Sequence, residues 1–244
     1  MPFTFSHPAI VLPLTFLPRK WFSLTGLVIG SITPDFEYFL RMRIQSSYSH
    51  TIGGLFWFDL PLGLLLAFVF HNIVRNKFFE NLPTILESRL SIFKKFDWNE
   101  YFKKNWFVVI VSLLIGAFSH IFWDSFTHDQ GYFVKIIPTL TKPVDILGRQ
   151  IPILKILQHS SSLIGGLLIV FAILKLKVDQ NAKGQMSLKY WSVLIGLTLT
   201  ILAFRVLIGL DLKAYGHIIV SGISAGLISL ILTSMLTRQK NNRC

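Results

Sequence analysis

The segment from His120 to His128 carries the residues whose types and spacing are best suited to chemistry: His120, Asp124 and His128 follow one another at intervals of four. On a helix, positions i, i+4 and i+8 fall within roughly 80° of one another, so both imidazoles and the carboxylate can face one site. Such donors favour zinc, manganese or iron, and zinc is our first choice. The spacing predicts a metal site, and the alternative is a set of ordinary polar groups at an interface.

Further potential ligands occur elsewhere in the chain. Pro34 disfavours helical geometry at Thr33, so we expect Asp35 to be exposed at a turn, where a merely solvated aspartate is the alternative to a ligand. The lone Cys244 excludes disulfides within the chain and a zinc site built on several cysteines, so a metal would be held by nitrogen and oxygen. The remaining candidates are His7, Glu37, His50, Asp59, Asp129 and His159.

The elements that must position these residues are membrane helices. Of the 244 residues, 52% are apolar and 15% are charged, which argues against a soluble protein. A bilayer core about 30 Å thick needs roughly 20 helical residues. Five runs are long enough, and two shorter ones, 8–18 and 21–34, are expected to form a hairpin. We therefore predict an all-α, polytopic membrane protein with five full spans, at 51–74, 105–123, 156–174, 190–210 and 214–237.

The net charge of +12 is explained better by membrane topology than by nucleic acid, because the basic residues cluster between the apolar runs. Short cytoplasmic loops hold the excess of lysine and arginine, which places 75–104, 175–189 and the tail with Arg238, Lys240 and Arg243 on that side. Arg41 and Arg43 go against this trend. The pattern predicts a multi-pass membrane protein, with the candidate ligands at or near the exoplasmic ends of helices.

The chain is expected to divide at residue 175. Residues 1–175 form the predicted metal-site domain, and 176–244 form a C-terminal pair of helices. Within the first domain, apolar residues interleave with basic ones over 75–104. This segment is expected to be an amphipathic helix on the inner membrane surface, and a helix that docks a partner is the competing interpretation.

Four segments carry a resemblance to a known family: MPFTFSHPA at the start, GSITPDFEYF (30–39), SHTIGGLFWFDLPLG (49–63) and GAFSHIFWDSFTH (116–128). Over residues 1–175 the chain resembles a bacterial family of multi-pass membrane proteins of unknown function. That family is similar to inner-membrane proteins described as membrane-bound metal-dependent hydrolases, so the resemblance implies a location in a bacterial cytoplasmic (inner) membrane. The order of histidines and aspartates is also distantly similar to that of zinc-dependent phospholipases C and of zinc nucleases from fungi and plants.

The resemblance implies a cluster of two or three zinc or manganese ions, with Asp124 as a bridging carboxylate. The phospholipase pattern has a carboxylate where this chain has Leu163, which leaves open whether one ion is missing and whether Glu37 replaces its ligand or supports other ligands. His159 and Asp59 are further candidates, and Asp59 equally suits a structural role. The implied ligands are His7, Asp35, His50, His120, Asp124 and His128.

These expectations favour a membrane-bound, metal-dependent hydrolase, since two metal ions can activate water and stabilise a phosphoryl transition state. A site at headgroup level suits a lipid or lipid-linked phosphoester that arrives by lateral diffusion. Two alternatives stay open: an ion transporter or channel, which would need polar groups throughout the membrane, and a scaffold with a structural metal. No nucleic-acid partner is expected.

Overall fold

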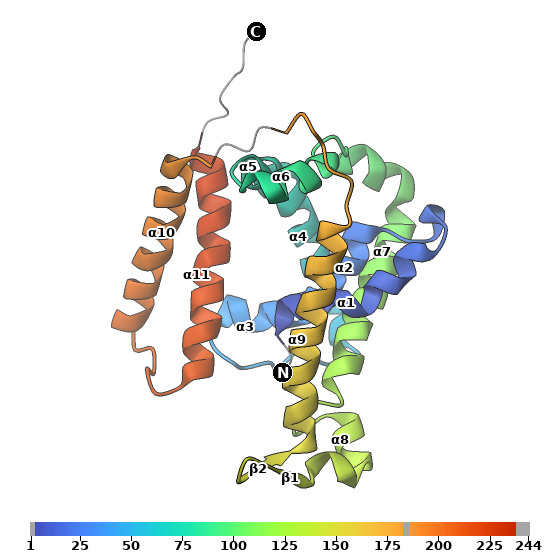
Figure 1. The fold of residues 1–244 in the computed structure, drawn as a ribbon, viewed down its shortest axis with the longest axis vertical. Coiled ribbons are helices and arrows are strands. Elements are labelled where there is room, and N and C mark those ends of the chain that lie inside the picture. Colours follow the sequence, from blue (N-terminus) through green and yellow to red (C-terminus); the bar gives the residue numbers. More distant parts are fainter. Residues whose placement is uncertain (1–2, 183–185, 238–244) are drawn as a thin grey trace. The chain divides into compact units, whose positions relative to one another are not determined.

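The computed structural model describes residues 3–182 and 186–237, and within them the chain is almost entirely helical (Figure 1). Lys183 and the basic tail residues Arg238, Lys240 and Arg243, which entered the topology prediction, lie outside the described residues. Five helices in the described part are long and apolar enough to cross a membrane, which confirms the predicted fold class. These spans are Leu55–Glu80, Trp98–Asp124, Ile153–Leu174, Leu188–Leu207 and Tyr215–Leu236.

The contacts group the chain into two compact units. The first comprises Met1–Asp35, Ser47–Leu64 and Lys104–Ala172. The second comprises Phe36–Ser46, Leu65–Lys103 and Ile173–Cys244. These units are built from discontinuous segments and do not test the domain boundary predicted at residue 175, which stays a prediction.

The first unit begins with the expected N-terminal hairpin. Its two short α-helices pack against each other, and Ser23 caps the second by accepting a hydrogen bond from the amide of Gly26. Between these two helices, Pro13 lies in a 3₁₀-helical turn and Pro18 directly precedes another. Both prolines prevent a regular α-helix there. The elements are η1 (Thr4–Ser6), α1 (Pro8–Val11), η2 (Leu12–Phe16), η3 (Arg19–Trp21), α2 (Leu24–Ile32) and η4 (Thr33–Asp35).

Close packing of α2 against α7 (Trp98–Asp124) fixes this hairpin. A β-carbon on Gly30 would lie 2.3 Å from the carbonyl oxygen of Leu113, and one on Gly116 would lie 2.4 Å from that of Leu27. The two helix backbones are therefore close because both positions lack a side chain. Ser112 adds a hydrogen bond, since its Oγ accepts from the amide of Ser23 at 2.8 Å.

A small cap connects α7 to α9 (Ile153–Leu174). Its two strands pair antiparallel, with Val144 opposite Ile151, around a turn in which Leu147 and Gly148 have positive φ angles. Val134, Leu140 and Leu154 are buried together beneath them. The cap consists of α8 (Tyr132–Ile136), η8 (Pro138–Thr141), β1 (Pro143–Ile146) and β2 (Arg149–Pro152).

The first span is not a uniform α-helix, because it contains two π-helical turns. It runs through η5 (Leu55–Asp59), α4 (Leu60–Val69), η6 (Phe70–Val74) and α5 (Arg75–Glu80). Such turns are frequent at functional sites. The next residues, predicted as one amphipathic helix over 75–104, are divided instead, because Pro83 prevents α5 from continuing. The pieces that follow α5 are α6 (Thr84–Leu90), η7 (Ser91–Phe93) and the start of α7.

The rest of the second unit consists of α3 (Phe36–Arg41), α10 (Leu188–Leu207) and α11 (Tyr215–Leu236). The predicted C-terminal pair, α10 and α11, pack against each other (Figure 1). Helix α11 also contacts α3, and Ser221 donates a hydrogen bond to the carbonyl of Met42 at 3.0 Å. Small hydroxyl residues of α11, including Ser224, are buried, as is typical where membrane helices pack closely.

Candidate metal centre

Four potential metal ligands from three parts of the first unit meet in one place: Asp35, His50, His120 and Asp124. Asp35 ends η4, directly after the α2 helix that the glycines hold against α7. Contrary to the expected exposed turn, Thr33 keeps helical backbone angles before Pro34, and Asp35 is fully buried. His50 lies in the loop before η5, and His120 and Asp124 are one turn apart near the end of α7. Each offers one donor atom, and these four atoms all lie within 4.8 Å of one another.

The four donors form a closed ring of short distances between histidine nitrogens and carboxylate oxygens. His120 Nε2 lies 3.5 Å from Asp35 Oδ1 and 3.3 Å from Asp124 Oδ2. His50 Nε2 lies 3.6 Å from each of the same two oxygens. Asp35 and His120 are fully buried, and Asp124 is nearly so, whereas the His50 side chain is 18% exposed.

These distances fit a shared cation better than direct ion pairs. Charge-assisted N–H···O bonds are usually about 2.7–2.9 Å long. Donors placed about 2.0–2.2 Å from a tetrahedral zinc ion are instead about 3.3–3.6 Å apart. Asp35 Oδ1, His120 Nε2 and both carboxylate oxygens of Asp124 are buried and make no hydrogen bond of ordinary geometry among the described residues. Buried polar atoms rarely lack partners, so the donor set fits a metal ion.

Neighbouring groups hold the donors in orientations that suit a metal. The Nδ1 atom of His120 lies 2.7 Å from the carbonyl oxygen of Ser31, which can only accept, so this nitrogen is the donor and Nε2 presents its lone pair. His50 Nδ1 lies 2.9 Å from Ser49 Oγ. Thr4 Oγ1 donates to Asp35 Oδ2, which orients the other oxygen of Asp35 towards the histidines.

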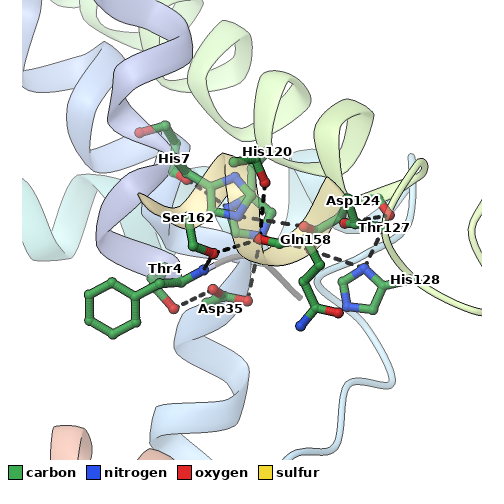
Figure 2. Close-up of polar contacts among 12 residues, drawn as sticks. Thr4, His7, Asp35, His120, Asp124, Thr127, His128, Gln158 and Ser162 are labelled. Atoms are coloured by element: carbon green, nitrogen blue, oxygen red, sulfur yellow. Dashed lines mark hydrogen bonds and ion pairs between the residues drawn. The ribbon is translucent and has the colours of Figure 1, made fainter. Parts of the chain in front are cut away.

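The two remaining histidines of the predicted set also converge on Asp124 (Figure 2). His7 Nε2 lies 3.5 Å from Asp124 Oδ1, on the opposite oxygen from His50 and His120, and the His7 ring stacks on that of His120. His128 Nδ1 lies 3.4 Å from Asp124 Oδ2 and 3.1 Å from the Asp124 carbonyl oxygen. The other five predicted ligands therefore gather around the Asp124 carboxylate, and three of them form the compact donor group with Asp124.

Outside the spanning helices, His7, His128 and Asp35 are in the forms that bind metals, whereas His50 is not. For His50, burial acts to lower the pKa, but the facing carboxylates of Asp124 and Asp35 outweigh it and raise the pKa above its usual value. Burial lowers the pKa of His7 to about 3, so its imidazole is neutral near pH 7. Burial also lowers the pKa of His128. For Asp35, burial acts to raise the pKa, but the facing His120 outweighs it, and the pKa falls below its usual range. Asp35 is therefore ionised.

The four additional candidates lie outside the four-donor group. One of them, Asp129, is exposed, and its Oδ2 lies 3.6 Å from Lys155 Nζ. The carboxylate of Glu37, in the second unit, accepts hydrogen bonds from Arg41 Nε and Ser46 Oγ, both at 3.0 Å. Asp59 is buried at the end of η5. His159 is exposed on α9, one position after Gln158.

Several supporting residues gave no signal in the sequence. Thr4 contacts Asp35, and the hydroxyl of Ser162 in α9 accepts from the amide of Phe3 at 2.8 Å while that of Ser6 donates to the Ser162 carbonyl. These bonds attach the segment that carries His7 to α9 (Figure 2). Serine and threonine are common in apolar segments, so the sequence alone does not mark these residues as important. Their role follows only from the long-range hydrogen bonds that they make in the folded chain.

The comparisons with known proteins identify a family and no activity. The family described as domain of unknown function (DUF4184) matches residues 1–235. No curated protein and no solved structure matches the chain. The predicted likeness to metal-dependent hydrolases stays a prediction. Because the match covers nearly all of the 244 residues, the chain belongs to the DUF4184 family.

Proposed function

We propose that the chain is a membrane-bound metal-dependent hydrolase that acts on a lipid or lipid-linked phosphoester. The observation that carries the proposal is the ring of four donor atoms from Asp35, His50, His120 and Asp124. An ion bound there supplies Lewis acidity, which activates water and stabilises negative charge on a phosphoryl group.

Partial exposure of the donor set favours catalysis over a structural metal. A structural site closes its coordination sphere, whereas a catalytic site keeps a position for water. The side chains of His50 and His128 are 18% and 31% exposed, while those of His7 and His120 are fully buried. Water therefore has access from the side of His50 and His128, whereas the side chains of His7 and His120 are shielded from solvent.

The proposal includes zinc or manganese, with two ions as the expected number. Support for a second ion comes from the way Asp124 divides its oxygens: Oδ2 faces His50, His120 and His128, and Oδ1 faces His7. A carboxylate placed in this way can serve two ions. Aspartate and neutral imidazole suit zinc and manganese alike.

The lipid part of the proposal rests on the position of the cluster in the chain. Asp124 is the last residue of a candidate span, and the chain contains five such spans. A substrate whose tails stay in the bilayer can reach such a site laterally. The proposed location is a bacterial inner membrane with the cluster on the exoplasmic side, as the distribution of lysine and arginine predicts.

Metal analysis combined with a hydrolysis assay tests the proposal. The chain is purified in mild detergent and its bound metals are measured by mass spectrometry, beside a double variant with His120→Ala and Asp124→Ala. We expect near-stoichiometric zinc or manganese in the wild type, its loss from the variant, and hydrolysis of a phospholipid by the wild type alone.

Each other result has a definite meaning. No bound metal in either protein after supplementation contradicts the hydrolase. Bound metal without hydrolysis of any lipid phosphoester favours a scaffold with a structural metal. Metal that crosses vesicle membranes in a protein-dependent way favours a transporter.

A further inference from the structure

A slot of about 330 Å³ lies beside His7, between the N-terminal segment and α9. Its apolar walls come from Ala9 and Ile10 on one side, Leu157, Ile164 and Leu168 on the other, and Trp123 of α7. The three α9 residues recur at spacings of seven and four, which places them on one face of that helix. We call this cavity the α9 slot.

The serines in the walls of the α9 slot add little polarity. Ser160 Oγ donates to the carbonyl of Ile156 at 2.8 Å, and Ser161 Oγ donates to that of Gln158 at 3.1 Å, both within α9. Ser6 Oγ likewise donates to a backbone carbonyl. Because these hydroxyl hydrogens are already engaged, the slot offers few donors to water or to a polar ligand.

His7 is the one titratable side chain among the described residues that line the α9 slot. Its Nδ1 atom is buried and makes no hydrogen bond among the described residues, and its Nε2 atom faces Asp124. The imidazole therefore belongs both to the slot wall and to the metal cluster. A molecule in the slot that ends in a polar group would place that group beside the candidate ligands.

The open rim of the α9 slot faces outwards from a candidate span. Leu157, Ile164 and Leu168 are 38%, 56% and 49% exposed, although all three are apolar. They belong to the span Ile153–Leu174, so their surroundings in a bilayer are hydrocarbon. A lipid chain can pass from the bilayer into the slot without crossing water.

The α9 slot has room for a stretch of hydrocarbon chain. An apolar cavity of about 150 Å³ admits benzene, and this slot is about twice as large. These features match the two parts of a lipid. The apolar walls and the exposed apolar rim suit its hydrocarbon chain, and His7 at the inner end suits its polar group.

We propose that the α9 slot holds one hydrocarbon chain of a membrane lipid, with the polar end of that lipid at His7. The role of this lipid as substrate rests on the proposed function, whereas its binding does not. The cluster then has two entrances, an apolar one past His7 for the lipid and a polar one past His50 and His128 for water and the released headgroup.

Photolabelling tests the binding directly. The full chain is placed in phosphatidylcholine vesicles that contain phosphatidic acid with a diazirine in its acyl chain, and labelled residues are mapped after irradiation. We expect labels on Ile10, Ile164 and Leu168. Ser161→Phe and Ala9→Phe, which fill the slot from opposite walls, reduce these labels by about tenfold, because a filled cavity cannot also accept a chain.

Leu167→Phe is the matched control, since Leu167 is 60% exposed on α9 and does not line the slot. This variant keeps the wild-type labels, and equal metal content in all variants shows that the cluster still forms. Labels on Ile164 and Leu168 that persist in either filling variant with wild-type metal content would overturn the proposal, as would labelling spread evenly over the exposed leucines of α9.

A hydrolysis assay separates the slot from the proposed function. We expect both filling variants to slow the hydrolysis of a phospholipid by a much larger factor than that of p-nitrophenyl phosphate, which has no chain. Slot labels without hydrolysis of either substrate by the wild type contradict the hydrolase and retain the slot. Hydrolysis of both substrates at wild-type rates by both filling variants retains the hydrolase and contradicts the slot.

Discussion

Asp124 places its two carboxylate oxygens against different histidines, and this division makes a prediction about the number of ions. His7 lies against Oδ1 alone, whereas His120 belongs to the four-donor group around Oδ2. We expect His7→Ala to lower bound metal from about two ions to one per chain, and His120→Ala to remove more. Mass spectrometry of the purified variants measures this. Unchanged metal in His7→Ala would argue for a single ion.

Thr4 tests how far the supporting residues control the cluster. Its hydroxyl donates to Asp35 and so orients the oxygen that faces His50 and His120. Loss of such a supporting bond typically costs about 10- to 100-fold in metal affinity. We therefore expect weaker zinc binding in Thr4→Val, measured by competition with a chelator. Thr4→Ser retains the hydroxyl and should bind zinc like the wild type; equal loss in both would contradict this role.

At the residue scale, spacing predicted His120, Asp124 and His128 together on one helix. The helix α7 ends at Asp124, so only the first two share it, and His128 approaches Asp124 from the turn that follows. Asp35 and His50 were predicted as ligands from the family resemblance. They lie 15 residues apart in irregular segments, so their spacing in the sequence does not predict that they meet. Thr4 could not be predicted at all. Its role depends on where the N-terminal segment folds, and a threonine near a chain start is compatible with many folds.

At the scale of elements, the contact between α2 and α7 delivers Asp35 to the cluster. Ala at position 30 would place a β-carbon 2.3 Å from the carbonyl oxygen of Leu113, so the helices must separate. Overpacking of this kind costs about 1–3 kcal/mol. We expect Gly30→Ala to lower the melting temperature and to weaken metal binding. In the control Gly196→Ala nothing lies within 4 Å, so thermal unfolding should be unchanged or slightly delayed.

The sequence predicted long apolar helices better than it predicted their irregularities. Length and hydropathy are enough to predict the five spans, because every helix that crosses a bilayer must be about 20 residues long and largely apolar. The π-helical turns of the first span have no such signature. The amphipathic helix expected over 75–104 is divided because Pro83 ends α5, and because Arg75 binds the carbonyls of Lys94 and Phe96 at 3.3 and 2.7 Å. Those bonds fold the segment back upon itself.

At the scale of the whole molecule, the distribution of basic residues predicts which side of the membrane carries the cluster. The cap residue Leu147 is 99% exposed at the tip of its hairpin, and Ile92 is 43% exposed in η7. Positive charge assigns the cap segment to the exoplasmic side and residues 75–104 to the cytoplasmic side. Replacing Cys244 by serine leaves a chain without cysteine, into which single probes can be introduced.

We expect Leu147→Cys to react with a membrane-impermeant maleimide in intact bacterial cells, and Ile92→Cys to react only after the cells are opened. The expectation follows from the positive-inside rule, under which the lysines and arginines of 75–104 would be retained on the cytoplasmic side during insertion. The reverse pattern would place the cap and the cluster that precedes it in the cytoplasm. Any lipid that enters the α9 slot would then come from the inner leaflet, and its headgroup would be released into the cell.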